Sequence, residues 1–443
     1  MDTLAQLRAG QLRGIRRLDL SAGLTEFPRE IFDLADSLEV LNLSANQLRS
    51  LPDDLHRLHR LQVLFCSDNA FTELPESLGR CAQLSMVGFK ACRIERVSAQ
   101  ALPPRLRWLI LTDNRIEHLP QALGERPHLQ KLMLSGNRLR QLPASLANAP
   151  QLELIRVAAN QLSELPHWLL ALPKLAWLAY AGNPLEADLT HAAPAPAIAW
   201  AQLHLQQPLG EGASGVIHQA TWQAPGQAPQ DVAVKLYKGS MTSDGSPLHE
   251  MHACIRAALH PNLIGVHGQV SDHPEGRAAL VMELIGPHYR NLAGLPSLAS
   301  CTRDVYPQGW RLSAEVALTI ALGIASVAAH LHGQGLNHGD LYGHNILFNP
   351  QGHCLLGDFG AAAGYDPAHS PVAGALQRIE VRAFGILLGE LLERIDGGLG
   401  AQDREQLQSL QERCCQPQVM GRPGFSAIER ELGELKLQPP ASA

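Results

Sequence analysis

The stretch HGDLYGHNIL, from His338 to Leu347, carries residue types that phosphoryl transfer uses. Asp340 and Asn345 stand five residues apart, between an apolar run that begins at Val316 and a strand-like NILF segment. In that chemistry a carboxylate orients the attacking hydroxyl and accepts its proton, and an amide oxygen five residues later helps to hold Mg²⁺. Asp358 follows in GDFG as a second candidate metal ligand. One Asp and one Asn alone are more often a capped turn, so the interpretation depends on the rest of the chain.

A glycine-rich segment precedes this loop. LGEGASGVI places Gly210, Gly212 and Gly215 in GxGxxG spacing, which lets backbone amides approach phosphate oxygens closely. No helix opens directly after these glycines, and VIHQATW has the pattern of a returning strand. The sequence therefore predicts a β-hairpin lid rather than a Rossmann turn.

A lysine and a glutamate follow in an order that suits a nucleotide site. Lys235 lies in the alternating strand DVAVKLY, and Glu250 is the only carboxylate of the helix PLHEMHACIRAAL, so we expect the two to form an ion pair. AALVMELIG then supplies a buried strand with the expected adenine-side hinge at its end. The predicted nucleotide-contacting residues are Gly210, Glu211, Gly212, Ala213, Ser214, Gly215, Ile217, Ala233, Lys235, Glu250, Met282, Glu283 and Leu284.

The first 190 residues repeat themselves. A pattern LxxLxLxxN recurs every 22 or 23 residues, with first leucines at Leu38, Leu61, Leu84, Leu106, Leu129, Leu152 and Leu175. This period predicts a leucine-rich-repeat horseshoe of about eight units, in which each unit buries the leucines of a short strand against its neighbours. A structural ladder is expected from the asparagines, with Cys92 in one of their places: Asn46, Asn69, Asn114, Asn137, Asn160 and Asn183.

The outward positions of these strands form an unusually apolar stripe. Contiguous apolar surface marks a partner site, so we expect a protein partner or substrate on the concave face. The alternative is that the stripe packs on the protein's own second domain. The residues concerned are Val40, Val63, Phe65, Met86, Trp108, Ile110, Met133, Leu154 and Trp177.

From residue 203 to 437 the chain resembles a protein kinase, on the ordered motifs GEGASG, VAVK, HPNLI, VMEL, HGDLYGHN and GDFG. The whole chain is similar to bacterial proteins that couple leucine-rich repeats to a serine/threonine-type kinase domain. The resemblance implies a multidomain fold with α/β and α+β parts: a leucine-rich-repeat solenoid over 1–190, a Pro/Ala linker over 191–202 and a two-lobed kinase domain over 203–437. Residues 438–443 are expected to form a disordered tail.

The resemblance also implies roles for single residues. Lys235 would bind the α- and β-phosphates of ATP, oriented by Glu250, and Asp340 would be the catalytic base. Asn345 and Asp358 would hold Mg²⁺. The implied activity is transfer of the ATP γ-phosphate to a protein hydroxyl, with ATP and Mg²⁺ as cofactors.

Several positions depart from the kinase pattern. Gly339 replaces the arginine that reads a phosphorylated activation loop, and Tyr342 replaces a lysine that contacts the transferred phosphate. Glu380 replaces the aspartate that braces the catalytic loop, and Arg422 lacks its usual glutamate because no APE motif is present. These departures keep two alternatives open: a small-molecule kinase of the aminoglycoside or choline type, and a nucleotide-binding pseudokinase scaffold.

Composition limits the class of protein. The 443 residues are 45% hydrophobic and 18% charged, which is typical of a folded chain, and the net charge of −6 argues against nucleic-acid binding. Eight cysteines without a CxxC pair indicate neither a zinc site nor a disulfide framework. The N-terminus lacks the pattern of a signal peptide, and the apolar run 316–329 is short for a membrane helix. We therefore expect a cytoplasmic protein without a membrane partner.

Overall fold

The computed structural model describes residues 3–185, 195–239, 241–257, 259–368 and 370–435. The chain divides into two compact units: residues 1–172 with 183–185, and residues 173–182 with 186–443. The predicted tail 438–443 lies outside the described residues, as does the first part of the predicted linker.

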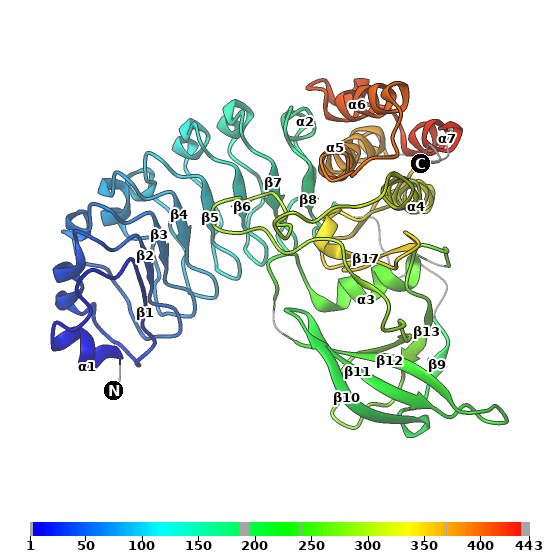
Figure 1. Cartoon of the computed structure of the whole chain (residues 1–443). Helices are drawn as coiled ribbons and strands as arrows, with labels where there is room; N and C mark the ends of the chain where they lie inside the picture. Colours follow the sequence, from blue (N-terminus) through cyan, green and yellow to red (C-terminus); the bar gives the residue numbers. More distant parts are fainter. Residues whose placement is uncertain (1–2, 186–194, 240, 258, 369, 436–443) are drawn as a thin grey trace. The chain divides into compact units, whose positions relative to one another are not determined.

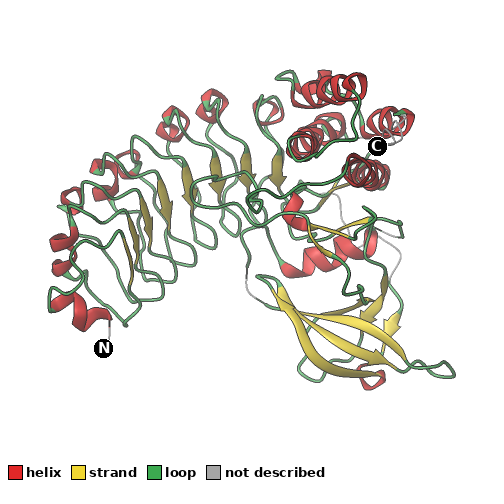
Figure 2. Cartoon of the chain, viewed as in Figure 1, coloured by secondary structure: helices red, strands yellow, loops and turns green. Residues whose placement is uncertain are grey.

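The first unit is built from three-residue strands that pair in parallel in chain order (Figures 1 and 2). Successive strands are offset by one repeat, so that Leu41 pairs with Leu64 and Leu64 with Val87. These central residues are fully buried, which explains the strict spacing of the leucines. The strands are β1 Arg17–Asp19, β2 Val40–Asn42, β3 Val63–Phe65, β4 Met86–Gly88, β5 Trp108–Ile110, β6 Lys131–Met133 and β7 Leu154–Arg156.

The returning segments form short helices behind these strands. Four of these helices follow the proline of a Leu-Pro pair, at Pro75, Pro120, Pro143 and Pro166, each with φ between −57° and −71°. Proline suits this place because its φ is fixed and a residue before the first helical turn needs no N–H donor. The helices are α1 Thr3–Arg8, η1 Arg29–Leu34, η2 Leu55–Arg57, η3 Glu76–Arg80, η4 Ala99–Ala101, η5 Gln121–Glu125, η6 Ala144–Asn148 and α2 His167–Leu170.

The asparagine ladder is confirmed. Asn137 Oδ1 accepts a hydrogen bond from the backbone N of Ile116 at 3.0 Å, and its Nδ2 donates to the carbonyls of Leu111 and Leu134 at 2.9 Å. Cys92 takes part by donating its Sγ–H to the carbonyl of Cys66 at 3.5 Å. The ladder is structural, because each side chain is spent on backbone groups of neighbouring repeats.

The boundary between the units differs from the predicted one. Strand β8 (Trp177–Ala179) has the repeat pattern, yet it belongs to the second unit, within residues 173–182. The linker prediction is corrected at its end: β9 (Ala197–Ile198) pairs in parallel with β13 as an edge strand, and η8 (Trp200–Gln202) follows it.

A six-stranded sheet forms one lobe of the second unit, in the order β10-β11-β12-β14-β13-β9. Its alternating valines give each strand one buried face, so Val232, Val234 and Val281 lie in one core cluster. Helix α3 (Pro247–Arg256) packs Met251 against the other face of the sheet, in green in Figure 1. The other strands are β10 Leu203–Glu211, β11 Gly215–Trp222, β12 Gln230–Tyr237, β13 Val266–Val270 and β14 Ala279–Glu283.

The other lobe is mainly helical, with α4 (Ala314–Gly333), α5 (Ala373–Leu392), α6 (Ala401–Cys415) and α7 (Phe425–Glu434). Two small antiparallel sheets hold the functional loops between them. Their elements are β15 Arg290–Asn291, β16 Leu336–Asn337, β17 Ile346–Phe348, β18 Cys354–Leu356 and β19 Ala363–Gly364; the short helices η9 Gly343–Asn345 and η10 Val419–Gly421 complete the lobe.

Helix α4 is longer than the sequence indicated. With 20 residues and a mean hydropathy of 1.7, it meets the length and composition of a membrane-spanning helix, although half of that window is buried in the protein. Ile320, Ile324 and Leu331 are fully buried, and α4 contacts α5, α7 and β18. A central helix of a folded lobe meets the same two criteria, and these contacts match that arrangement.

Candidate active site

The glycine-rich segment is the turn of a β-hairpin, as predicted. β10 and β11 pair antiparallel up to Glu211 and Val216, and the turn is closed by a hydrogen bond from Gly212 N to Gly215 O at 2.9 Å. A Cβ at Gly215 would come 2.5 Å from the Leu236 carbonyl, so only glycine fits there. Gly210 has open space around its Cα. The turn therefore leaves room for a group to lie against its backbone.

Lys235 and Glu250 form the predicted ion pair. Lys235 projects from β12 and Glu250 from the first turn of α3, where Ser246 caps the helix by accepting from Leu248 N at 3.3 Å. The Glu250 side chain is 3% exposed, and its Oε2 has no hydrogen-bond partner among the described residues. A buried, unsatisfied carboxylate oxygen beside a lysine is costly unless a cation or donor completes it.

The catalytic-loop motif folds around Asp340. Asn345 Nδ2 donates to both the Asp340 carbonyl and Asp340 Oδ2 at 2.9 Å, which ties the two predicted chemical residues together. The amide nitrogen of Asn345 is spent on this bond, so its oxygen is the atom available to a cation. Asp340 N donates to His338 Nδ1 at 3.3 Å, and His338 Nε2 pairs with the Gly357 carbonyl at 2.9 Å.

Glu380 braces this loop in spite of its substitution for the usual aspartate. Its Oε1 accepts from Gly339 N at 2.7 Å, and its Oε2 pairs with His332 Nε2 at 2.7 Å. Burial raises the pKa of Glu380, but the hydrogen bond and charge of His332, the charge of His338 and the hydrogen bond from Gly339 N together outweigh burial, and the net pKa lies below its ordinary value. The longer side chain reaches the same loop backbone from within α5, so the brace is kept.

Acidic groups converge where the predicted metal ligands lie. A Cβ built on Gly360 would come 3.2 Å from Asp358 Oδ1, 3.6 Å from Asp244 Cβ and 3.9 Å from Glu250 Oε2. Burial is the largest cause that raises the pKa of Asp358 above its ordinary value, and the carboxylates of Glu250, Asp340 and Asp244 raise it further. Such an excess of negative charge is what a divalent cation would neutralise.

Two adjoining cavities connect these groups. The first, about 340 Å³, is lined by the glycine turn together with Lys235, Glu250 and Asp358. The second, about 90 Å³, shares Ile217 with the first and continues to Met282 on β14 along apolar side chains. An open glycine turn, a lysine, clustered carboxylates and an apolar recess fit a nucleotide with a divalent cation, in which ATP would lie along the turn and Asn345 and Asp358 would hold Mg²⁺.

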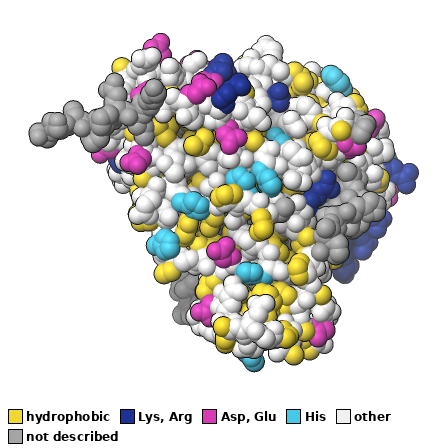
Figure 3. Space-filling model, turned by 90° about the vertical axis from the view of Figure 1, so that its right-hand side faces the viewer, with side chains coloured by type: hydrophobic (Ala, Val, Ile, Leu, Met, Phe, Trp, Pro, Cys, Tyr) yellow, Lys and Arg dark blue, Asp and Glu magenta, His cyan; other side chains and the backbone are white. Residues whose placement is uncertain are grey.

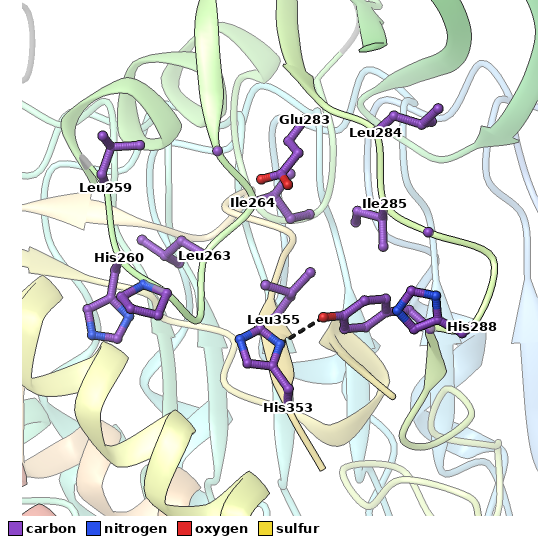
Figure 4. A pocket seen from close by; sticks show the side chains of 14 residues that line it. Leu259, His260, Leu263, Ile264, Glu283, Leu284, Ile285, His288, His353 and Leu355 are labelled. Carbon is purple, nitrogen blue, oxygen red and sulfur yellow. Dashed lines mark hydrogen bonds between the residues drawn. The ribbon is translucent and has the colours of Figure 1, made fainter. Parts of the chain in front are cut away.

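Ala233 is buried directly opposite Met282 on the neighbouring strand, so the two side chains point to the same face of the sheet. Two other predicted nucleotide contacts lie elsewhere. Glu283 and Leu284 line a different cavity of about 520 Å³, together with His288 and His353 (Figure 4). The Tyr289 hydroxyl and His353 Nδ1 lie 2.8 Å apart there. Side chains alternate along a strand, so when Met282 faces one cavity the side chain of Glu283 faces away from it.

Sequence reasoning missed three residues that line the first cavity: Thr242, Asp244 and Gly360. Thr242 and Asp244 lie in the polar segment before α3, where Thr242 Oγ1 accepts from the backbone N of Asp244 and of Gly245. A Ser-Asp-Gly sequence indicates only a turn. Its proximity to Asp358 depends on how the two lobes fold together.

The predicted partner-binding stripe is less exposed than expected. Trp177 is 1% exposed inside the second unit, so its assignment to a partner site is corrected: its indole is occupied within the protein. Among the described residues, the exposed large hydrophobic side chains are elsewhere, at Leu209, Leu248, Leu259, Leu295, Val305 and Met420. Val63, Met86, Met133 and Leu154 are buried, and Val40, Phe65, Trp108 and Ile110 are half-buried.

Histidines are numerous but do not gather into a ligand set. On the face drawn in Figure 3 they are spread over the surface. Over the described ranges no group of three or more His, Cys, Asp or Glu side chains has the arrangement of a metal site.

Comparisons with known proteins identify the two kinds of module in this chain. The family model for protein tyrosine and serine/threonine kinases matches residues 203–394, and leucine-rich-repeat models match residues 37–58 and 104–162. The serine/threonine-protein kinase mos of Gallus gallus is 31% identical over 178 residues, which are 38% of this chain and 49% of the relative. That of Nycticorax nycticorax is 31% identical over 175 residues, 36% of this chain and 82% of the relative.

The match spans about half the length of the first two curated relatives, 49% and 54%. Among solved structures, the leucine-rich-repeat protein LIC12759 of Leptospira interrogans is 28% identical, with a TM-score of 0.39 over 41% of this chain and 46% of that chain. These two relatives are vertebrate proteins. The residues matched by the kinase family model include the motifs of Lys235, Asp340 and Asp358. The chain belongs to the serine/threonine-protein kinase family and carries leucine-rich repeats ahead of its kinase domain.

Proposed function

We propose that the protein transfers the γ-phosphate of ATP to a serine or threonine hydroxyl of a protein. The observation that carries this proposal is the joint presence of the Asp340–Asn345 hydrogen bonds and the buried Lys235–Glu250 pair. A nucleotide-binding scaffold has no use for a positioned base, and this site retains one.

The residues divide the work by position. Asp340, held by Asn345, orients the acceptor hydroxyl and takes its proton as the oxygen attacks phosphorus. Lys235, held by Glu250, binds phosphate oxygens at the glycine turn. The backbone amides of this turn approach the same oxygens. ATP would supply the phosphoryl group, and Asn345 and Asp358 would hold Mg²⁺, which would neutralise negative charge on the phosphates.

The proposal also covers the location of the protein and its partner-binding surface. We place the protein in the cytoplasm, among bacterial proteins that couple repeats to a kinase. The half-buried concave residues Val40, Phe65, Trp108 and Ile110 are the surface we propose for a protein partner or substrate.

The test is phosphate transfer from labelled ATP in the presence of Mg²⁺, with Asp340→Asn as the matched inactive variant. We expect the wild-type chain to label itself or a protein acceptor, and Asp340→Asn to lose at least about a hundredfold in rate. Equal labelling by both proteins would refute the proposed enzymatic activity. The alternative of a nucleotide-binding scaffold would then remain.

A second comparison separates the acceptor classes. Protein acceptors and small hydroxylated acceptors of the aminoglycoside and choline type are offered at equal concentration, and transfer to protein is expected. Transfer to the small acceptors alone would assign the protein to the small-molecule kinases instead.

A further inference from the structure

Residues 173–182 carry the last repeat pattern but are part of the kinase-containing unit. This segment, which includes β8, lies against the catalytic loop and helix α5. Its contacts coincide with the positions at which the sequence departs from the kinase pattern.

Trp177 is the centre of this contact. Its indole stacks on the ring of Tyr342, with 4.2 Å between centroids and an interplanar angle of 5°. Its Nε1–H donates to the Leu341 carbonyl at 3.1 Å, and the Arg303 guanidinium lies 5.5 Å from the centre of its ring. Trp177 thus holds the two residues that directly follow Asp340 through a hydrogen bond and a ring stack.

Two arginines anchor the start of the segment. Arg422 Nη2 donates to the Pro173 carbonyl at 2.9 Å, and Arg382 Nε of α5 donates to the Lys174 carbonyl at 3.1 Å. Arg422 is 1% exposed, and its other two side-chain nitrogens, Nε and Nη1, donate to the carbonyls of Gln416 and Arg378 at 3.0 Å. Arg422 lacks the glutamate that usually pairs with it. Its guanidinium therefore donates hydrogen bonds to backbone oxygens, and one of these oxygens belongs to residues 173–182.

Gly339 is fitted to the same segment. It has φ +74°, and a Cβ there would come 2.8 Å from the Leu178 carbonyl and 2.5 Å from the Ala361 carbonyl. An arginine at this position, or any other side chain, would collide with β8 as it is docked.

We propose that Trp177 is a positioning residue for the phosphoryl transfer, through which β8 holds the catalytic loop. Asp340 is then fixed from three directions: Glu380 binds Gly339 N before it, Asn345 binds its carboxylate, and Trp177 binds Leu341 and Tyr342 after it. This inference rests on the proposed function for its kinetic consequence. Its structural consequence, a catalytic loop ordered by β8, stands separately.

Steady-state kinetics tests the positioning role in the full chain. Trp177→Ala is expected to lower kcat on the order of 10- to 100-fold, because the base loses its alignment, while KM for ATP changes less than about twofold. Trp177→Phe keeps a ring on Tyr342 and should lose no more than about fivefold. Trp168→Ala removes a half-buried indole from α2 of the first unit and is expected to leave kcat unchanged.

A double-mutant cycle identifies the contact. Tyr342→Phe keeps the ring stack and is expected to behave as wild type, whereas Tyr342→Ala should lose kcat like Trp177→Ala. The double variant Trp177→Ala/Tyr342→Ala should be no worse than either single variant, because both remove one contact. Fully additive losses would overturn the assignment of this pair.

Amide hydrogen exchange supplies a measurement independent of activity. Residues 336–345 should exchange at least about tenfold faster in Trp177→Ala than in Trp168→Ala under native conditions. Equal exchange rates in Trp177→Ala and Trp168→Ala would overturn the proposal, and so would equal kcat values in these two variants. The proposal would also fail if Trp177→Ala and Trp177→Phe both lost kcat, ATP binding and the unfolding midpoint together. If wild type transfers no more phosphate than Asp340→Asn, the proposed function fails, and the exchange comparison still decides the positioning role.

Discussion

Asp304 is buried and accepts two hydrogen bonds from His344, from the backbone N at 3.1 Å and from Nδ1 at 2.6 Å. Tyr306 lies beside it and donates its hydroxyl to Glu390 Oε2 at 2.9 Å. A Cβ on Gly343 would come 2.9 Å from that hydroxyl and 3.0 Å from Asp304 Oδ2, so the Tyr306 hydroxyl and the Asp304 carboxylate lie directly against the catalytic loop. The groups beneath the loop are therefore polar and hydrogen-bonded.

Glu390 gives the site a pH dependence of stability. The pKa of Glu390 is raised from 4.5 to about 7: burial is the largest cause and the charge of Asp304 adds to it, while the Tyr306 hydrogen bond and the charges of Arg303 and Arg394 lower the pKa. Between pH 4.5 and 7 the folded carboxyl keeps a proton that the unfolded chain has released, so stability falls as the pH rises through this range. Above pH 7 the stability stays lower by the full amount, on the order of 3 kcal/mol.

Glu390→Gln should remove this slope, because the amide keeps an acceptor for Tyr306 without a titrating proton. We expect the variant to gain on the order of 3 kcal/mol over wild type at pH 8 and little at pH 5, measured by denaturant unfolding. Glu393→Gln is the matched control, since that side chain is 75% exposed and paired only with Arg394 in the described structure. Parallel pH profiles for wild type and Glu390→Gln would contradict the assignment.

At the scale of elements, the repeats were predictable because one repeat's strand, asparagine and proline recur at fixed offsets. The three-residue strands β2 to β7 begin two residues after the first leucine of each unit, where the outward column was expected. Helix α5 carries Glu380, which the sequence indicated as the residue in place of the bracing aspartate, and the helix begins before it, at Ala373. Its first residues lie where the kinase pattern has an activation segment. The resemblance to kinases therefore gave no reason to expect a helix there.

The asparagine ladder should carry much of the stability of the repeat strands. Asn137→Ala leaves the buried Ile116 N–H and the carbonyls of Leu111 and Leu134 without this partner, and we expect a loss of about 2–3 kcal/mol in the free energy of unfolding. Asn148→Ala, at the exposed end of η6, is expected to change the free energy of unfolding by less than about 0.5 kcal/mol. Urea unfolding followed by circular dichroism measures both, and equal midpoints would count against the ladder.

At the scale of the whole molecule, the eight cysteines are free thiols, and six of them are buried. Burial raises the pKa of the Cys66 thiol well above its ordinary value, that of Cys81 to about 11 and that of Cys354 to about 12. Because the thiolate is the reactive form, these groups should be protected at pH 8.

Thiol labelling should therefore report unfolding unit by unit. The first unit holds Cys66, Cys81 and Cys92, and the second holds Cys254, Cys301, Cys354, Cys414 and Cys415. We expect slow native labelling and, with rising denaturant, two steps that expose three and five thiols, because each unit has its own core. A mass spectrum that shows all eight thiols reacting in one step would indicate a single cooperative unit.

The sequence alone determined the repeat architecture, the glycine turn, the Lys235–Glu250 pair and the loop around Asp340, because each depends on a short-range period or spacing. Only the tertiary structure decided that Glu283 faces away from the nucleotide cavity and that Asp244 approaches Asp358. It also decided that β8 belongs with the kinase-containing unit, where Trp177 binds Leu341 across 164 residues of sequence. A contact between residues so far apart in the chain produces no pattern in the sequence around either of them. Trp177 fits its strand, and Leu341 fits its loop, whether or not the other residue is near.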